Sequence, residues 1–171
     1  IMNELIKKFK SYGLLEFLVI FSVIYVVSML LWTASTRSAV EDKANTVKSN
    51  HKLVVDFINF EINACDQGND TSKTKWGDFC KDEWSSQKVI LYINENLEIV
   101  NPYSSNKKII KSAQDPRLQA EGKAGQSTEI GVIFLSSQNF SSEAGSEWVI
   151  GTCIKSPCVA AGNNELTSVY R

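Results

Sequence analysis

The chain has 171 residues, with 18 Lys and Arg against 19 Asp and Glu, and a formal net charge of −1. This near-neutral balance gives no basic field of the kind that attracts nucleic acid. The hydrophobic content of 43% is ordinary, no long internal repeat is evident, and the length outside the N-terminal region is enough for one small domain.

The N-terminal region consists of a short basic leader, residues 1–11, and a continuous apolar run from Leu14 to Trp32. A helix needs roughly 20 apolar residues to cross a bilayer core of about 30 Å, so the run predicts a transmembrane helix. Lys7, Lys8 and Lys10 precede the run, which places the N-terminus in the cytoplasm and the rest of the chain outside.

One acidic residue, Glu16, interrupts this apolar run. An ionisable side chain within a membrane helix is costly and is a functional candidate by default. In an ordinary single-pass anchor, Glu16 would lie near the lipid headgroups and reach water. The apolar run could also be a cleaved secretory signal. Its cleavage site would fall near Ala34, but helical patterning continues past that residue.

The helix is expected to continue beyond the membrane, to about Cys65. Apolar or small residues recur in steps of three and four, which is helical periodicity: Val40, Ala44, Val47, Val54, Ile58 and Ile62. His51 fills the missing place in this stripe, so we interpret it as a packed residue and not as a catalytic base or metal ligand. Gly68 is the expected stop.

The remainder predicts a small α+β domain. Residues 66–87 form a polar loop, and the segment 88–93 fits either a strand or a short capped helix. Three later segments, 129–136, 148–154 and 166–170, are rich in branched and aromatic residues and predict an antiparallel sheet. The stripe of the long helix would cover one face of that sheet.

Four cysteines, Cys65, Cys80, Cys153 and Cys158, all follow the apolar run. An even number outside the cytoplasm favours disulfides. Of the three possible pairings we prefer Cys65–Cys80 and Cys153–Cys158, because each pair brackets one local loop. A zinc site is the alternative, but there is no close C-x-x-C and the lone histidine is distant in sequence.

This layout resembles that of the type IV pilins, and the similarity is strongest over Tyr12-Gly13-Leu14-Leu15-Glu16-Phe17-Leu18-Val19-Ile20. In that family a leader is removed before an aromatic first residue, and glutamate is the fifth residue of the mature chain. The resemblance therefore implies cleavage between Ser11 and Tyr12 and an assembly role for Glu16. This chain departs from the family in having Ser11 where glycine is usual, and in having no Pro or Gly between Leu14 and Gly68.

The resemblance implies a structural subunit, not an enzyme, with no cofactor or metal. The expected divisions are the leader at 1–11, a membrane and assembly helix at 12–35, and an extracytoplasmic pilin-like domain at 36–171 whose helical continuation is 36–65 and whose sheet region is 88–171. The implied partners are membrane lipid before assembly, a prepilin peptidase, the inner-membrane assembly machinery and further copies in a helical filament. A type II secretion pseudopilin and a membrane-anchored periplasmic binding domain are the alternative functions.

In such a filament the apolar helices leave lipid and pack together, which buries the free amine that cleavage creates. A buried unpaired charge is expensive, so the amine needs an opposite partner. We expect the Glu16 carboxylate to supply it, within the chain or across to a neighbour. Head-to-tail contacts of this kind do not close on themselves, which is how filaments grow.

Overall fold

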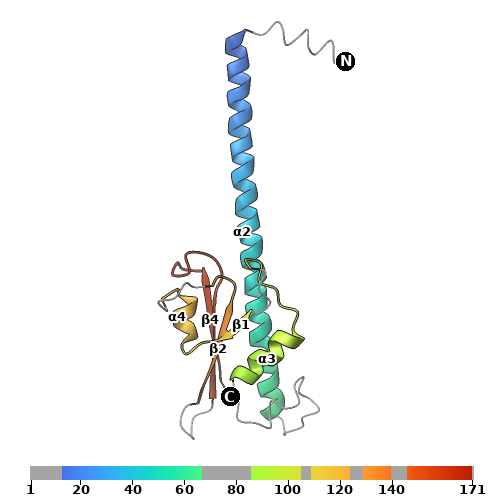
Figure 1. The fold of residues 1–171 in the computed structure, drawn as a ribbon, viewed down its shortest axis with the longest axis vertical. Coiled ribbons are helices and arrows are strands. Elements are labelled where there is room, and N and C mark those ends of the chain that lie inside the picture. The colour runs from blue at the N-terminus through green and yellow to red at the C-terminus, as the bar shows by residue number, and fades with distance from the viewer. Residues whose placement is uncertain (1–12, 67–85, 105–108, 124–128, 140–145, 171) are drawn as a thin grey trace. The chain divides into compact units, whose positions relative to one another are not determined.

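The computed structural model describes residues 13–66, 86–104, 109–123, 129–139 and 146–170. Its elements in chain order are the helix α2 (Leu14–Asp66), the helix α3 (Ser86–Asn96), the strand β1 (Ile110–Ser112), the short helix α4 (Pro116–Ala120) and the strands β2 (Ile133–Asn139), β3 (Ser146–Cys153) and β4 (Asn164–Tyr170) (Figure 1). Residue contacts divide the chain into two compact units, with the second beginning at Asp42.

The helix α2 is continuous over 53 residues, as the unbroken periodicity and the absence of Pro and Gly predict. At 1.5 Å per residue its length is about 80 Å. It ends at Asp66, two residues before Gly68. Of the described elements, the first unit contains the N-terminal part of α2. The second unit contains the remainder of α2 together with the sheet and the two other helices.

The sheet has four strands in the order β1-β2-β3-β4. The pairs β2–β3 and β3–β4 are antiparallel, with Leu135 opposite Ile150 and Ile150 opposite Thr167. The edge strand β1 runs parallel to β2, with Ile110 opposite Ile133. The sheet is therefore mixed, and the expected purely antiparallel sheet is wrong in this respect. Parallel neighbours need a crossover connection, and α4 lies on the path from β1 to β2.

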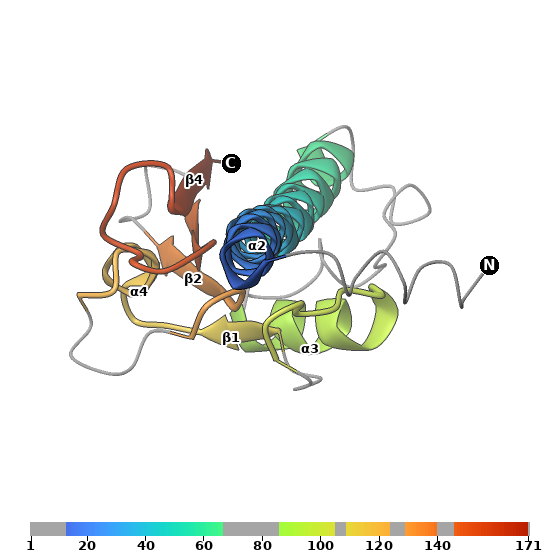
Figure 2. The same cartoon turned by 90° about the horizontal axis from the view of Figure 1, so that it is seen from above.

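Within the second unit, α2 packs on one face of the sheet and α4 lies against the other (Figures 1 and 2). The core between α2 and the sheet joins residues from helices and strands: Val54, Phe57, Ile58, Ile62, Val89, Ile90, Ile93, Ile109, Ile110, Ile133, Leu135, Trp148, Ile150 and Val169. The α2 members belong to the stripe that the periodicity predicted, apart from Phe57. Its ring stacks on Tyr92 of α3, with the two centroids 5.7 Å apart.

The ambiguous segment 88–93 is helical. It lies inside α3, whose buried residues Val89, Ile90 and Ile93 recur at helical spacing and join the core. A strand of the same composition would have placed alternate residues on opposite faces, whereas one helical face collects all three.

The helix α4 lies in a segment for which the sequence predicted no helix or strand. Asp115 caps it, because its Oδ1 accepts a hydrogen bond from the Arg117 N–H at 2.9 Å, and Pro116 occupies the first turn. Gly151 of β3 makes room for this helix, since a Cβ there would collide with the Pro116 carbonyl. The sequence signal for the start of this helix was Asp115 directly before Pro116.

Candidate membrane and assembly site

The N-terminal part of α2 exposes apolar side chains in every direction. The exposed fractions range from 42% at Ile20 to 76% at Trp32. The exposed large hydrophobic residues of this part are Phe17, Leu18, Val19, Ile20, Phe21, Val23, Ile24, Tyr25, Val26, Val27, Met29, Leu30, Leu31 and Trp32. In the described part of the chain, α2 is the one helix long and apolar enough to cross a membrane. A helix that is apolar all round belongs in lipid or among other helices.

Four hydroxyl groups in this part of α2 bond to the helix's own backbone. Ser22 Oγ donates to the Val19 carbonyl at 2.8 Å, and Ser28 Oγ donates to the Ile24 carbonyl at 2.7 Å. Thr33 and Thr36 bond in the same way to carbonyls three residues earlier. A polar group in lipid must be satisfied internally, and these four hydroxyls are.

Glu16 lies in the first turn of α2 and has a local partner that the sequence analysis missed. The Gly13 N–H donates to Glu16 Oε2 at 3.0 Å, and the Gly13 carbonyl accepts from the Glu16 N–H at 3.0 Å. Gly13 is thus the N-cap and Glu16 the third helical residue, which is the glutamate half of a capping box. A carboxylate here also interacts favourably with the positive end of the helix dipole. The sequence signal for this contact was a small residue, Gly13, three positions before Glu16 at the start of the helix.

The structure describes only some of the predicted site residues. Ser11 and Tyr12, the expected cleavage position, lie outside the described residues. Cys80 and the side chain of Cys65 also lie outside them, so the Cys65–Cys80 disulfide stays a prediction. Glu16 and the pair Cys153 and Cys158 are described, and they belong to different units of the chain.

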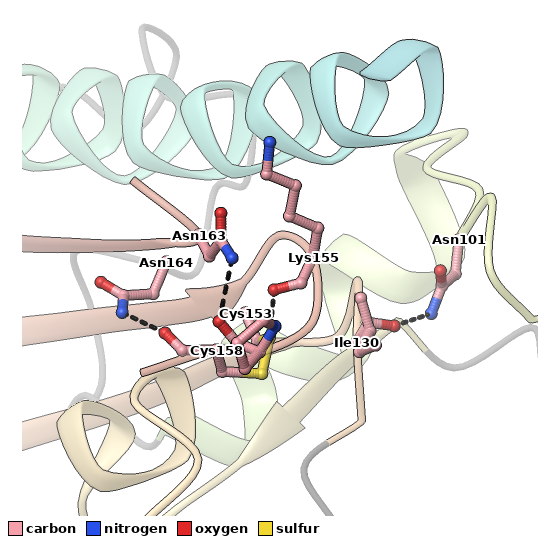
Figure 3. Close-up of a disulfide and its surroundings, with 8 residues drawn as sticks. Asn101, Ile130, Cys153, Lys155, Cys158, Asn163 and Asn164 are labelled. Atoms are coloured by element: carbon pink, nitrogen blue, oxygen red, sulfur yellow. Dashed lines mark hydrogen bonds between the residues drawn. A yellow bond between two sulfur atoms is a disulfide. The ribbon is translucent and has the colours of Figure 1, made fainter. Parts of the chain in front are cut away.

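Cys153 and Cys158 form a disulfide, with their Cα atoms 5.3 Å apart, and it closes the turn that follows β3 (Figure 3). Two asparagines hold the turn: Asn163 Nδ2 donates to the Pro157 carbonyl at 2.9 Å, and Asn164 Nδ2 donates to the Cys158 carbonyl. The Ile154 N–H also donates to the Asn163 carbonyl at 2.7 Å. The covalent bond therefore lies within a turn that backbone and amide contacts already define.

Another asparagine, Asn101, holds the segment that precedes β2. Asn101 Nδ2 donates to the Ile130 carbonyl at 3.0 Å, and Asn101 Oδ1 accepts from the Tyr103 N–H at 2.9 Å (Figure 3). Gly131 has a φ of +78° beside this amide, and a Cβ there would collide with Asn101 Oδ1. Residues 102 and 103 form a turn, and the Asn101 amide ties this turn to the segment just before β2.

His51 is buried on the stripe of α2, as its position in the periodicity predicted. Its Nδ1 lies 2.9 Å from Thr152 Oγ1 of β3, and its Nε2 lies 2.9 Å from Thr167 Oγ1 of β4. Burial disfavours the charged imidazolium and lowers the pKa of His51 to about 4. The ring is therefore neutral near pH 7, with one nitrogen donating and the other accepting.

Glu147 is a buried acid on the opposite face of β3, and nothing in the sequence singled it out. Tyr170 Oη donates to Glu147 Oε1 at 3.0 Å, and Arg117 Nη2 lies 3.4 Å from the same oxygen. The Ser168 hydroxyl, together with Tyr170 and Arg117, holds the pKa of Glu147 below its ordinary value against the opposing effect of burial. The cluster satisfies a charge between β3, β4 and α4, which is a structural arrangement.

Two other features bear on binding. A groove of about 610 Å³ follows α2 and is lined by Ser49, Lys52, Leu53, Asp56, Phe57, Phe60 and Leu97. Among the residues that the structure describes, no group of three or more His, Cys, Asp and Glu could hold a metal ion.

Comparison with known proteins identifies no relative. No protein-family model matches the chain, and neither a curated protein nor a solved structure matches it significantly.

Proposed function

We propose that this protein is a structural subunit of a type IV pilus-like filament. The apolar part of α2 anchors the subunit in the inner membrane before assembly and packs against other copies in the filament. A prepilin peptidase removes the leader after Ser11, and the domain beyond Trp32 lies outside the cytoplasm. A minor pilin and a secretion pseudopilin would use the same helix in the same way.

The proposal rests on the contrast between an exposed apolar part and a buried part within one continuous helix. The N-terminal part of α2 buries none of its large apolar side chains from Phe17 to Trp32, whereas Val47, Val54 and Ile58 further along are fully buried. A simple anchor needs only a span of roughly 20 residues, and its helix need not contribute to the core of its domain. A filament subunit uses both parts, because one supplies the apolar surface for assembly and the other belongs to the domain core.

The capping contact of Glu16 is compatible with its proposed role in assembly. Only Oε2 accepts from Gly13, and an ionised carboxylate has about four acceptor sites on its two oxygens. Removing the leader would create a free amine on Tyr12, one residue before Gly13. The second oxygen of Glu16 can then bind that amine, or the amine of a neighbouring copy, within an apolar filament core.

The proposal is tested by the mass and location of the native protein. Filaments sheared from the cell surface should contain this chain, and its N-terminal residue should be Tyr12. Intact protein found only in the inner membrane, with residues 1–11 still attached, would favour the anchored binding domain instead.

A further inference from the structure

The contact between α2 and the sheet contains one buried titratable ring, His51, which is the only histidine of the chain. Its two nitrogens bond to hydroxyls from two adjacent strands, Thr152 of β3 and Thr167 of β4, each at 2.9 Å. The ring is 4% exposed, and neighbouring positions of the stripe, Val47 and Val54, are 0% exposed. His51 therefore joins three elements at a largely buried place, where only the Thr167 side is partly exposed.

The hydrogen-bond pattern at this joint depends on the ring being neutral. A neutral imidazole donates from one nitrogen and accepts at the other, so one threonine hydroxyl accepts from the ring and the other donates to it. Adding a proton turns the accepting nitrogen into a donor. The hydroxyl that had donated must then turn its hydrogen away and find another acceptor inside the core, while the core takes up a charge.

We propose that the His51 joint is an acid-sensitive contact, in which a proton taken up by the imidazole loosens the second part of α2 from β3 and β4. Loosening exposes the apolar stripe of α2 that the sheet covers at neutral pH. The inference concerns the domain alone and does not depend on the proposed filament function.

Among the described residues, the charged groups that surround the joint are of mixed sign. Lys48 lies on α2 one turn before His51, and Lys155 follows β3 with its side chain extending toward α2 (Figure 3). Glu165 shares the α2-facing side of β4 with Thr167, as strand alternation requires, and it is half-buried. On β3 the α2-facing residues Trp148, Ile150 and Thr152 carry no charge. In the described part of the chain, two cations oppose a positive charge on the ring and one acid favours it, so these groups together do not favour protonation.

The acid response linked to Glu147 occurs in a lower pH range than that linked to His51. Burial lowers the pKa of His51 to about 4 from 6.5, so the unfolded chain binds more protons than the native one between these values. Stability linked to His51 is therefore complete above pH 6.5 and falls as the pH drops toward about 4. The pKa of Glu147 is lowered from 4.5, so its contribution is lost only below that value.

The test is amide hydrogen exchange of the full chain in detergent micelles at pH 7 and about pH 4.5, corrected for intrinsic exchange rates. Protection of α2 amides between Ala44 and Ile62 should fall roughly 50-fold in the wild type, as the two pKa values imply. His51→Gln is the matched control, because its amide can donate to one hydroxyl and accept from the other but cannot become charged. Its protection should change no more than about threefold.

Three outcomes would overturn the proposal. The first is an equal loss of protection in the wild type and in His51→Gln, which would assign the effect to carboxylates. The second is an equal loss over β2 and β3, which would mean that the whole domain unfolds. The third applies even where His51→Gln fails to fold. The single histidine gives one set of ring NMR signals, and a titration midpoint above about 5.5 would contradict the joint, whereas one below it supports the joint.

Discussion

The two parts of α2 share one backbone helix and treat their apolar side chains in opposite ways. In the first unit Ile24 is 56% exposed, whereas in the second unit Ile58 is 0% exposed. Composition explains the difference: the first part is apolar all round, so no sheet could cover it, and the second part has a stripe with polar residues on its other faces. A continuous helix can thus stabilise a domain with one part and leave the other part free for lipid or for other helices.

The largest effect is expected from removing the apolar part of α2 altogether. A chain that begins at Arg37 should fold without detergent, because the removed residues contribute nothing to the described core. Circular dichroism should show the remaining helix and sheet, and the thermal midpoint of the domain should match that of the full chain in micelles. A truncated chain that is unfolded, beside a folded full chain, would mean that the apolar part supports the domain.

Shortening one apolar side chain in each part of α2 should have very different effects on the stability of the domain. Ile58→Ala removes a fully buried side chain from the contact between α2 and the sheet, so we expect it to lower the free energy of unfolding by about 3–4 kcal/mol. Ile24→Ala is the matched control, and it should leave the unfolding of the domain unchanged. Denaturant titrations of both variants in the same detergent measure the difference, and similar values for the two would refute the division.

Removing the described disulfide should have a smaller effect. The pair Cys153 and Cys158 is separated by 5 positions, and closing so short a loop contributes about 2 kcal/mol in the chain-entropy model. The double variant Cys153→Ala, Cys158→Ala should therefore remain folded but unfold at lower denaturant. Loss of all structure would show that the asparagine contacts of this turn do not hold it alone. Peptide mapping without reductant tests the predicted Cys65–Cys80 bond in the same preparation.

The smallest effect is expected on the face of the sheet away from α2. Tyr170→Phe removes the hydroxyl that donates to Glu147 Oε1, which should cost about 1–2 kcal/mol at pH 7. The cost should shrink below pH 4.5, because the lowered pKa of Glu147 makes its stabilising contribution one that protonation removes. Unfolding titrations at pH 7 and below pH 4 measure it, and a cost that grows in acid would contradict the ionised state of this carboxylate.

Local patterns in the sequence predicted the elements that depend on local or periodic signals. The long helix, its buried stripe, the position of His51 and the strands near β3 and β4 follow from apolar spacing. The first strand of the predicted sheet, 129–136, is shifted to Ile133–Asn139. Its first residues form a turn instead, because Gly131 has a positive φ and its N–H donates to the Cys153 carbonyl.

Features that depend on distant partners were not predictable in the same way. The strand β1 has three residues and gains its register from β2, across α4. The helix α3 is selected over a strand because Val89, Ile90 and Ile93 find one shared core. Glu147 gains its partners from α4 and β4, which no spacing within β3 reveals. At the candidate assembly site, the sequence predicted Glu16 as a functional residue but not its capping contact with Gly13.

The most direct test of the proposed function compares filament yield in wild type, Glu16→Gln and Glu95→Gln cells at equal membrane levels of the subunit. Gln retains the capping contact with Gly13 and removes only the charge, so insertion and folding should be unchanged. Removing one member of a buried ion pair costs about 3–5 kcal/mol, so filaments should be nearly absent in Glu16→Gln. Glu95, exposed on α3, receives the same chemical change and should give wild-type filaments. Undiminished filaments in Glu16→Gln would contradict the assembly role of this residue.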